Sequence, residues 1–211
     1  MNTCKLDSWK QELIDIISKL KEESAPIEDI IQFGLYEDDV GYKKKYDDFE
    51  FLFEQLPVQE VCKYILSTRN KPTVEVLEYF VSKGFDLEKE GNYLWSPGGG
   101  AFVESSLIMG SIYACNYEVT KYLLEKGMRP EKFWVDYVCQ GYEPGCVETP
   151  TSLENRLRIA ELVMKYVDKA EMSDDCYIIV PDSKFFGKVL LEGLRILGVT
   201  MPKKIRIALQ T

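Results

Sequence analysis

SSLIMGSIYACNYEVTKYLLEKGMRP, residues 105 to 130, is the stretch that decides the fold. Both of its halves carry apolar or small side chains at helical spacing, and the second half ends at Gly127. The inward positions are Leu107, Ile108, Ser111, Ile112 and Cys115 in the first half, and Val119, Tyr122, Leu123 and Leu124 in the second. Such spacing marks the buried face of a helix, and glycine favours the conformation that follows a helix end. The segment therefore predicts two helices joined by a short turn.

A second copy of this pattern lies upstream. VLEYFVSKGFDLEK, Val76 to Lys89, matches VTKYLLEKGMRPEK, Val119 to Lys132, at the valine, the tyrosine, the Lys-Gly pair and the final lysine, with a constant offset of 43 residues. A repeat at such a distance indicates units that are too small to fold alone and that stack on their neighbours. We therefore expect an all-α solenoid of helical hairpins.

Residues 105–130 resemble an ankyrin repeat. Glu118 to Gly127 and Pro130 match the outer helix and its exit, Ser105 to Leu107 stand where the family has its Thr-Pro-Leu start, and Asn116-Tyr117 replaces the turn. The resemblance extends to residues 59–90 and 131–202, and it implies a domain that works by binding other macromolecules. Because the offset of 43 exceeds the family's unit of about 33 residues, insertions are expected between hairpins. Helical repeats of another kind are the alternative.

The rest of the chain is interpreted around these hairpins as a single domain, residues 1–211. We expect acidic N-terminal capping helices in residues 1–56, repeat hairpins in 57–202, and a C-terminal cap in 203–211 that forms a terminal helix. Within the repeats, Pro72 opens a helix with Leu77, Phe80 and Val81 inward, Phe133 belongs to a helix after Pro130, and Thr151 with Glu154 forms a capping box. Residues 176–180 form either a strand or a buried link.

Composition limits the chemistry. The chain has no histidine, which removes the most common general base near neutral pH. Its six cysteines contain no CxxC pair, so neither a zinc site nor a redox motif is indicated, and Cys62 and Cys115 lie on apolar helical faces. No run approaches the length of a membrane helix. We expect no catalytic residue, no cofactor, no metal and no membrane contact, in a cytoplasmic protein.

Charge and aromatic residues indicate where a partner binds. Residues 1–60 hold 15 acidic and 7 basic side chains, whereas the whole chain has a net charge of −9. Such a surface repels nucleic acid and attracts basic proteins, and tyrosine and tryptophan in loops are frequent binding hot spots. The predicted partner-binding residues are Tyr36, Glu37, Asp38, Asp39, Tyr42, Tyr46, Asp47, Asp48, Tyr93 and Trp95. A solvated acidic surface is the alternative.

The sequence thus predicts a non-catalytic module that binds a basic protein. Small acidic proteins with divergent repeats resemble the immunity proteins that neutralise toxins, so an immunity or inhibitor role is one form of this expectation. A carboxylate- and metal-dependent hydrolase, in which Asp and Glu from different helices converge in one pocket, is one alternative, and a structural subunit of a larger assembly is another. Adjacent acidic pairs such as Glu22-Glu23 and Asp174-Asp175 are interpreted as solvated surface. The glycine-rich stretch Ser96 to Glu104 is interpreted as a turn between repeats, because it lacks the lysine of a phosphate-binding loop.

Overall fold

The computed structural model describes Asp15, Ser18, Lys19 and residues 21–25, 52–68, 73–89, 93–95, 103–140, 150–180 and 184–209. Most of these residues are helical, as expected, and short strands accompany the helices. In chain order the elements are α4 (Val58–Thr68), α5 (Val74–Ser82), β1 (Tyr93–Trp95), β2 (Val103–Ser105), α6 (Leu107–Tyr113), α7 (Tyr117–Glu125), α8 (Trp134–Gln140), α9 (Pro150–Met164), β3 (Tyr177–Val180), α10 (Lys184–Ile196) and β4 (Arg206–Leu209).

The described residues belong to two compact units, and the first of them is built around Phe80. This unit takes residues up to Ile65 and Phe80–Asp86. The Phe80 ring meets Phe53 and Phe85 edge-on, with centroids 6.0 and 6.3 Å away. Gly84 ends α5 with a φ of 99°, a value that glycine tolerates better than any other residue. The helix and its glycine end are confirmed, but the inward position of Val81 is wrong, because its side chain is 37% exposed.

The second unit takes Leu66–Tyr79 and all residues from Leu87 onward, and the α6–α7 hairpin is its most regular part. The Asn116 side chain caps α7 by accepting the backbone N–H of Val119 at 3.3 Å, and Gly127 follows the helix with a φ of 97°. Ser111 and Thr120, both fully buried, join the two helices through their hydroxyls at 3.0 Å. The predicted hairpin is confirmed. Cys115 is a correction, since it lies in the turn after α6 with a φ of 51° and is half-buried.

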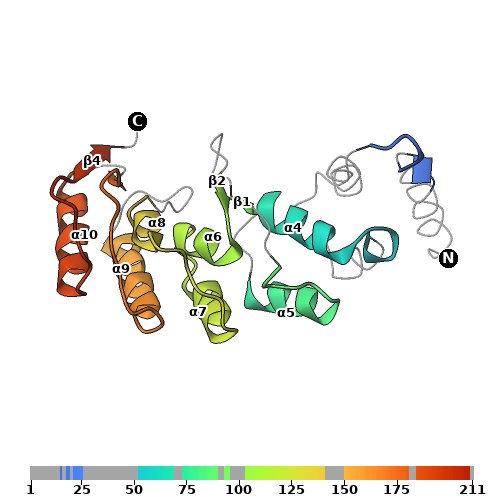
Figure 1. The fold of residues 1–211 in the computed structure, drawn as a ribbon, viewed down its shortest axis with the longest axis horizontal. Coiled ribbons are helices and arrows are strands. Elements are labelled where there is room, and N and C mark those ends of the chain that lie inside the picture. Colours follow the sequence, from blue (N-terminus) through green and yellow to red (C-terminus); the bar gives the residue numbers. More distant parts are fainter. Residues whose placement is uncertain are drawn as a thin grey trace, which may run out of the picture. The chain divides into compact units, whose positions relative to one another are not determined.

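The helices of the second unit pack in two rows. In one row α6 contacts α8, and α8 contacts β3; in the other row α7 contacts α9, and α9 contacts α10. Figure 1 shows α7, α9 and α10 following one another in this second row, from green to red. Helices α8 and α9 also contact each other across the rows.

Two short strands precede α6. β1 and β2 pair antiparallel, with Tyr93 opposite Ser105 and Trp95 opposite Val103, and both strands contact α6. The sequence predicts an insertion here but no strands, because three-residue segments carry too little pattern to indicate a strand. Ser96 to Gly100 lie outside the described residues.

The C-terminal end is a strand, and the prediction of a terminal helix in residues 203–211 is wrong. β4 pairs parallel with β3 in the register Tyr177 to Arg206 through Val180 to Leu209, so that the strand alternative for residues 176–180 is confirmed. Two parallel neighbouring strands need a crossover connection between them, and α10 connects β3 to β4 in this way. The segment after Gly198 and Pro202 pairs with a buried strand, which satisfies its backbone better than an isolated helical turn could.

Two helix starts also differ from expectation. Phe133 precedes α8 and is 39% exposed, whereas its neighbour Trp134 is the buried residue. Helix α9 already begins at Pro150, so Thr151 lies inside the helix and is not its N-cap. Proline suits the first helical position, since it has no N–H to leave unpaired.

Candidate functional site

The closest approach between α9 and α10 is made possible by Gly193. A Cβ atom built on Gly193 would lie 2.5 Å from Cδ2 of Leu157, a distance that real side chains do not tolerate. Glycine in mid-helix costs stability relative to alanine, and such a residue commonly marks a place where another element comes close. The two helices can therefore approach each other closely at this position.

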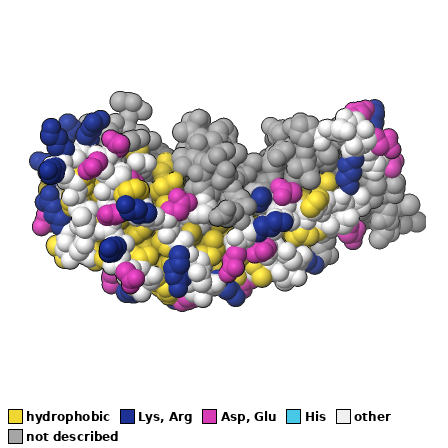
Figure 2. All heavy atoms as spheres, viewed as in Figure 1, with side chains coloured by type: hydrophobic (Ala, Val, Ile, Leu, Met, Phe, Trp, Pro, Cys, Tyr) yellow, Lys and Arg dark blue, Asp and Glu magenta, His cyan; other side chains and the backbone are white. Residues whose placement is uncertain are grey.

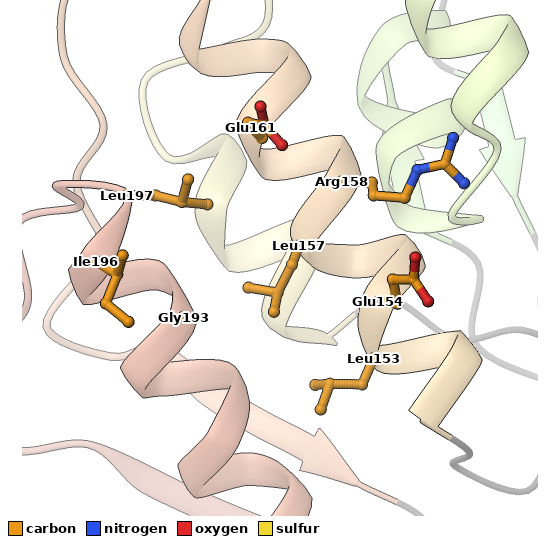
Figure 3. Close-up of a pocket in the computed structure, with 8 residues that line it drawn as sticks. All are labelled: Leu153, Glu154, Leu157, Arg158, Glu161, Gly193, Ile196 and Leu197. Carbon is orange, nitrogen blue, oxygen red and sulfur yellow. The ribbon is translucent and has the colours of Figure 1, made fainter.

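This α9–α10 groove has a volume of about 400 Å³ and is lined mainly by apolar side chains. Figure 3 shows Leu153 and Leu157 extending from α9 toward α10, where Ile196 and Leu197 lie on the opposite side. Ile196 is 79% exposed, which is unusual for a large aliphatic residue on a helix. The full lining consists of Leu153, Glu154, Leu157, Arg158, Glu161, Gly193, Ile196 and Leu197.

Carboxylates dominate the charged edge of the groove. Glu154, Arg158 and Glu161 are all exposed residues of α9. The Arg158 guanidinium lies over the Tyr117 ring, 4.6 Å from its centroid, and Figure 3 shows this side chain pointing away from α10. Glu161 forms a 3.6 Å ion pair with the exposed Lys165, a contact that solvent screens strongly. The groove thus offers an apolar floor beside a negatively charged edge.

A buried arginine holds α9 in place behind the groove. Arg156 is 3% exposed, and its guanidinium donates hydrogen bonds to the carbonyls of Cys139 at 3.3 Å and Ile179 at 3.2 Å. Cys139 is near the C-terminus of α8, where carbonyls lack partners within the helix and the dipole favours a cation. One side chain therefore ties α9 to both α8 and β3.

A second link joins α8 to the segment before β3. The Asp136 carboxylate accepts the backbone N–H of Ser173 at 3.0 Å and also the Ser173 hydroxyl. Close by, the hydrogen bond with Cys139 and burial both raise the pKa of the Cys176 thiol, and the two cysteines are buried. Burial likewise raises the pKa of the Cys62 thiol. Reactive cysteines have lowered pKa values, so these thiols act as small apolar core groups.

No family of proteins, curated protein or solved structure matches this chain. Among the helices that the structure describes, none is both long enough and apolar enough to span a lipid bilayer. In the same residues, no three or more His, Cys, Asp or Glu side chains gather where they could hold a metal ion. The acidic pairs Glu22-Glu23 and Asp174-Asp175 are exposed.

The predicted partner-binding residues are only partly within the described structure. Tyr36, Glu37, Asp38, Asp39, Tyr42, Tyr46, Asp47 and Asp48 lie outside the described residues. Tyr93 and Trp95 are the two ends of β1, where their backbones pair with β2. The structure therefore brings these two residues to one strand, directly before the glycine-rich stretch that begins at Ser96.

Sequence reasoning missed the α9–α10 groove. Its residues come from two helices that are about 40 positions apart, and no local pattern says that these helices are neighbours. The one available signal was Gly193, a glycine inside the apolar helical pattern LLEGLRI, which indicates a close approach of another element.

Proposed function

We propose that this chain is a non-catalytic, ankyrin-like protein-interaction module that binds a basic protein partner. The two rows of the second unit support the solenoid part of this proposal, because each hairpin packs on the equivalent elements of the next one, as in repeat arrays. The local likeness of residues 105–130 to an ankyrin repeat supports it as well.

The α9–α10 groove is the observation that carries the binding role. Exposed apolar side chains beside charged ones are typical of protein-binding surfaces, whose centre is apolar and whose rim is polar. Leu157 and Ile196 offer apolar contact, and Glu154 and Glu161 offer negative charge next to it. The groove therefore fits a partner segment that inserts an aliphatic or aromatic side chain and carries lysine or arginine beside it.

The acidic N-terminal segment, residues 1–60, also favours a basic partner, because its charge acts over a longer range than the carboxylates of the groove. Its net charge is −8, from 15 acidic and 7 basic residues. Clustered charge of one sign raises the association rate with an oppositely charged partner and repels one of like charge. An immunity or inhibitor protein directed against a basic toxin is the form of this function that agrees with such a charge distribution.

Affinity capture followed by a binding measurement tests the proposal. The chain is immobilised, proteins are captured from its native host and identified, and the recovered protein is purified and titrated against the chain by calorimetry. We expect a basic protein. Ile196→Ser should weaken its binding by roughly tenfold or more, since removing a buried aliphatic side chain costs about 1.5–3 kcal/mol.

Phe185→Ser is the matched control for this substitution. Phe185 is also a large exposed residue of α10, at 66%, but it does not line the groove. Its removal should leave the affinity within about twofold, since isolated surface contacts contribute little. The proposal fails if only acidic proteins are captured, or if the two substitutions change the affinity equally.

A further inference from the structure

The C-terminal end of the chain has the opposite charge from the rest. Residues 184–209 contain six basic side chains and one acidic side chain, a net charge of +5 in a chain whose total is −9. Five of the six cations are exposed residues that we name the basic face: Lys184, Lys188, Lys203, Lys204 and Arg206. The sixth, Arg195, is paired with Glu192 at 3.4 Å and does not belong to this face.

Packing of α10 on β4 gathers these cations. A Cβ atom on Gly187 would lie 2.8 Å from Cγ2 of Ile207, so the first turns of α10 lie directly against the strand. Lys184 and Lys188 belong to these first turns, and Lys203, Lys204 and Arg206 belong to the segment that leads into β4 and begins it, so all five lie at this end of the second unit. Figure 2 shows dark-blue side chains gathered on the end of the second unit where α10 and β4 lie.

The described carboxylates of the chain do not neutralise the basic face. None of its five cations forms an ion pair within the part of the chain that the structure describes, although Glu192 lies on the same helix and Asp174 and Asp175 precede the partner strand β3. Five like charges held together by packing repel one another, and an acidic ligand would relieve this repulsion. The face therefore needs a complementary anionic surface.

We propose that the basic face binds the acidic N-terminal segment of a second copy of this chain. The net charges of −8 and +5 are complementary, and both belong to every molecule, so each copy carries one donor surface and one acceptor surface. A nucleic acid is disfavoured as the occupant, because the rest of the chain would repel its phosphates. A head-to-tail contact of this kind is heterologous, and unless it closes into a ring it continues from molecule to molecule.

This self-association would regulate access to the acidic segment. A molecule whose acidic segment is occupied by a neighbour cannot offer that segment to a basic partner, so partner and neighbour compete. The inference concerns the isolated chain and does not require the α9–α10 groove to bind anything. Its test therefore uses the purified chain alone, and its outcome is independent of the capture experiment.

Sedimentation velocity of the full chain, measured over a range of protein concentrations, tests the contact. At about 0.01 M salt, where charges interact over roughly 30 Å, the average mass should rise above the monomer mass of 24.4 kDa and keep rising with concentration. At about 1 M salt, where the range falls to roughly 3 Å, the chain should return to the monomer. A monomer under both conditions at every concentration overturns the proposal.

Charge reversal identifies the surfaces involved. Lys203→Glu with Lys204→Glu should weaken self-association by about tenfold or more, because like charges then meet across the contact. Lys126→Glu with Lys169→Glu is the matched control, since both residues are exposed, lie outside the basic face and change the net charge equally. Equal losses in the two variants would mean that only net charge matters, and would overturn the assignment of the face.

A mixing experiment tests the partner surface. Asp38→Lys with Asp39→Lys should also abolish self-association, but this variant and the variant with Lys203→Glu and Lys204→Glu should associate when mixed, because each then offers a surface that suits the other. Failure of the mixture to associate contradicts the head-to-tail contact. A labelled single-stranded oligonucleotide serves as the test of the other occupant. If it binds to the basic face of the wild-type chain while that chain stays monomeric, the occupant is a nucleic acid and the proposal of a second copy is overturned.

Discussion

The α6–α7 hairpin and the C-terminal part of the second unit, from α9 to β4, are built by different kinds of interaction. In the hairpin, Asn116 caps α7 and Gly127 follows it, so each decisive contact joins residues less than ten positions apart. In the C-terminal part, Arg156 bonds to Cys139 and Ile179, and Gly193 meets Leu157. Local patterns describe the first region, whereas the second depends on contacts between distant segments.

The largest loss of stability is expected from Arg156→Ala, a substitution in the C-terminal part. The substitution leaves two buried carbonyls without their donor and opens a cavity, so the free energy of unfolding should fall by about 3 kcal/mol. Arg158→Ala, two residues away and exposed, removes only the contact of its guanidinium with the Tyr117 ring and should lower it by less than about 1 kcal/mol. Urea denaturation measures both, and equal effects would show that the buried bonds of Arg156 do not hold the region.

The hairpin has its own sensitive position at Gly127. Its φ of 97° is strained for any residue with a Cβ atom, and no neighbouring atom lies within 4 Å of where that Cβ would be. Gly127→Ala should therefore lower the free energy of unfolding by about 1–2 kcal/mol through backbone strain alone. An unchanged midpoint in thermal denaturation would contradict this reading of the helix end.

The effects of substituting Gly193 and Leu157 on the free energy of unfolding should be coupled and not additive. Gly193→Ala forces Leu157 to move, at a cost of about 1 kcal/mol after the better helix propensity of alanine is counted. In a Leu157→Ala background the same substitution should be neutral or stabilising. A double-mutant cycle by urea denaturation measures the difference, and an additive cycle would mean that the helices do not approach here.

The smallest loss of stability is expected from breaking an exposed ion pair between two residues that are far apart in the sequence. Lys132 and Glu171 form a 2.7 Å ion pair in which the lysine side chain is 70% exposed. Lys132→Met should change the free energy of unfolding by less than about 0.5 kcal/mol, because solvent screens such pairs. A loss above about 1 kcal/mol in denaturation at low salt would show that exposed long-range pairs also support the fold.

The difference between local and long-range contacts explains which features the sequence could predict. The hairpin, the buried face of α7 and the glycine ends at Gly84 and Gly127 followed from spacing and from glycine chemistry, and all were confirmed. The terminal helix was wrong because residues 203–209 contain apolar residues compatible with either a helix or a strand. Only the presence of β3 at pairing distance decides between them.

The α9–α10 groove was even harder to predict from the sequence than the terminal strand. Leu157 and Ile196 lie within residues 57–202, where repeat hairpins were expected, but no local pattern indicates that these two residues face one another. The buried role of Arg156 was also unforeseen, since an arginine on an amphipathic helix normally lies in solvent. The charge of residues 184–209 could be counted from the sequence, yet only the packing of α10 on β4, seen at the contact of Gly187 with Ile207, brings those cations to one end of the second unit.

Native-state hydrogen exchange on the Arg156→Ala variant tests most directly whether the two regions are held differently. Because the lost bonds belong to the C-terminal part, amides of α9, α10 and β4 should exchange about a hundredfold faster than in the wild type. Amides of α6 and α7, which keep their local caps and the Ser111–Thr120 bond, should lose far less protection. An equal loss of protection in both regions would contradict the account.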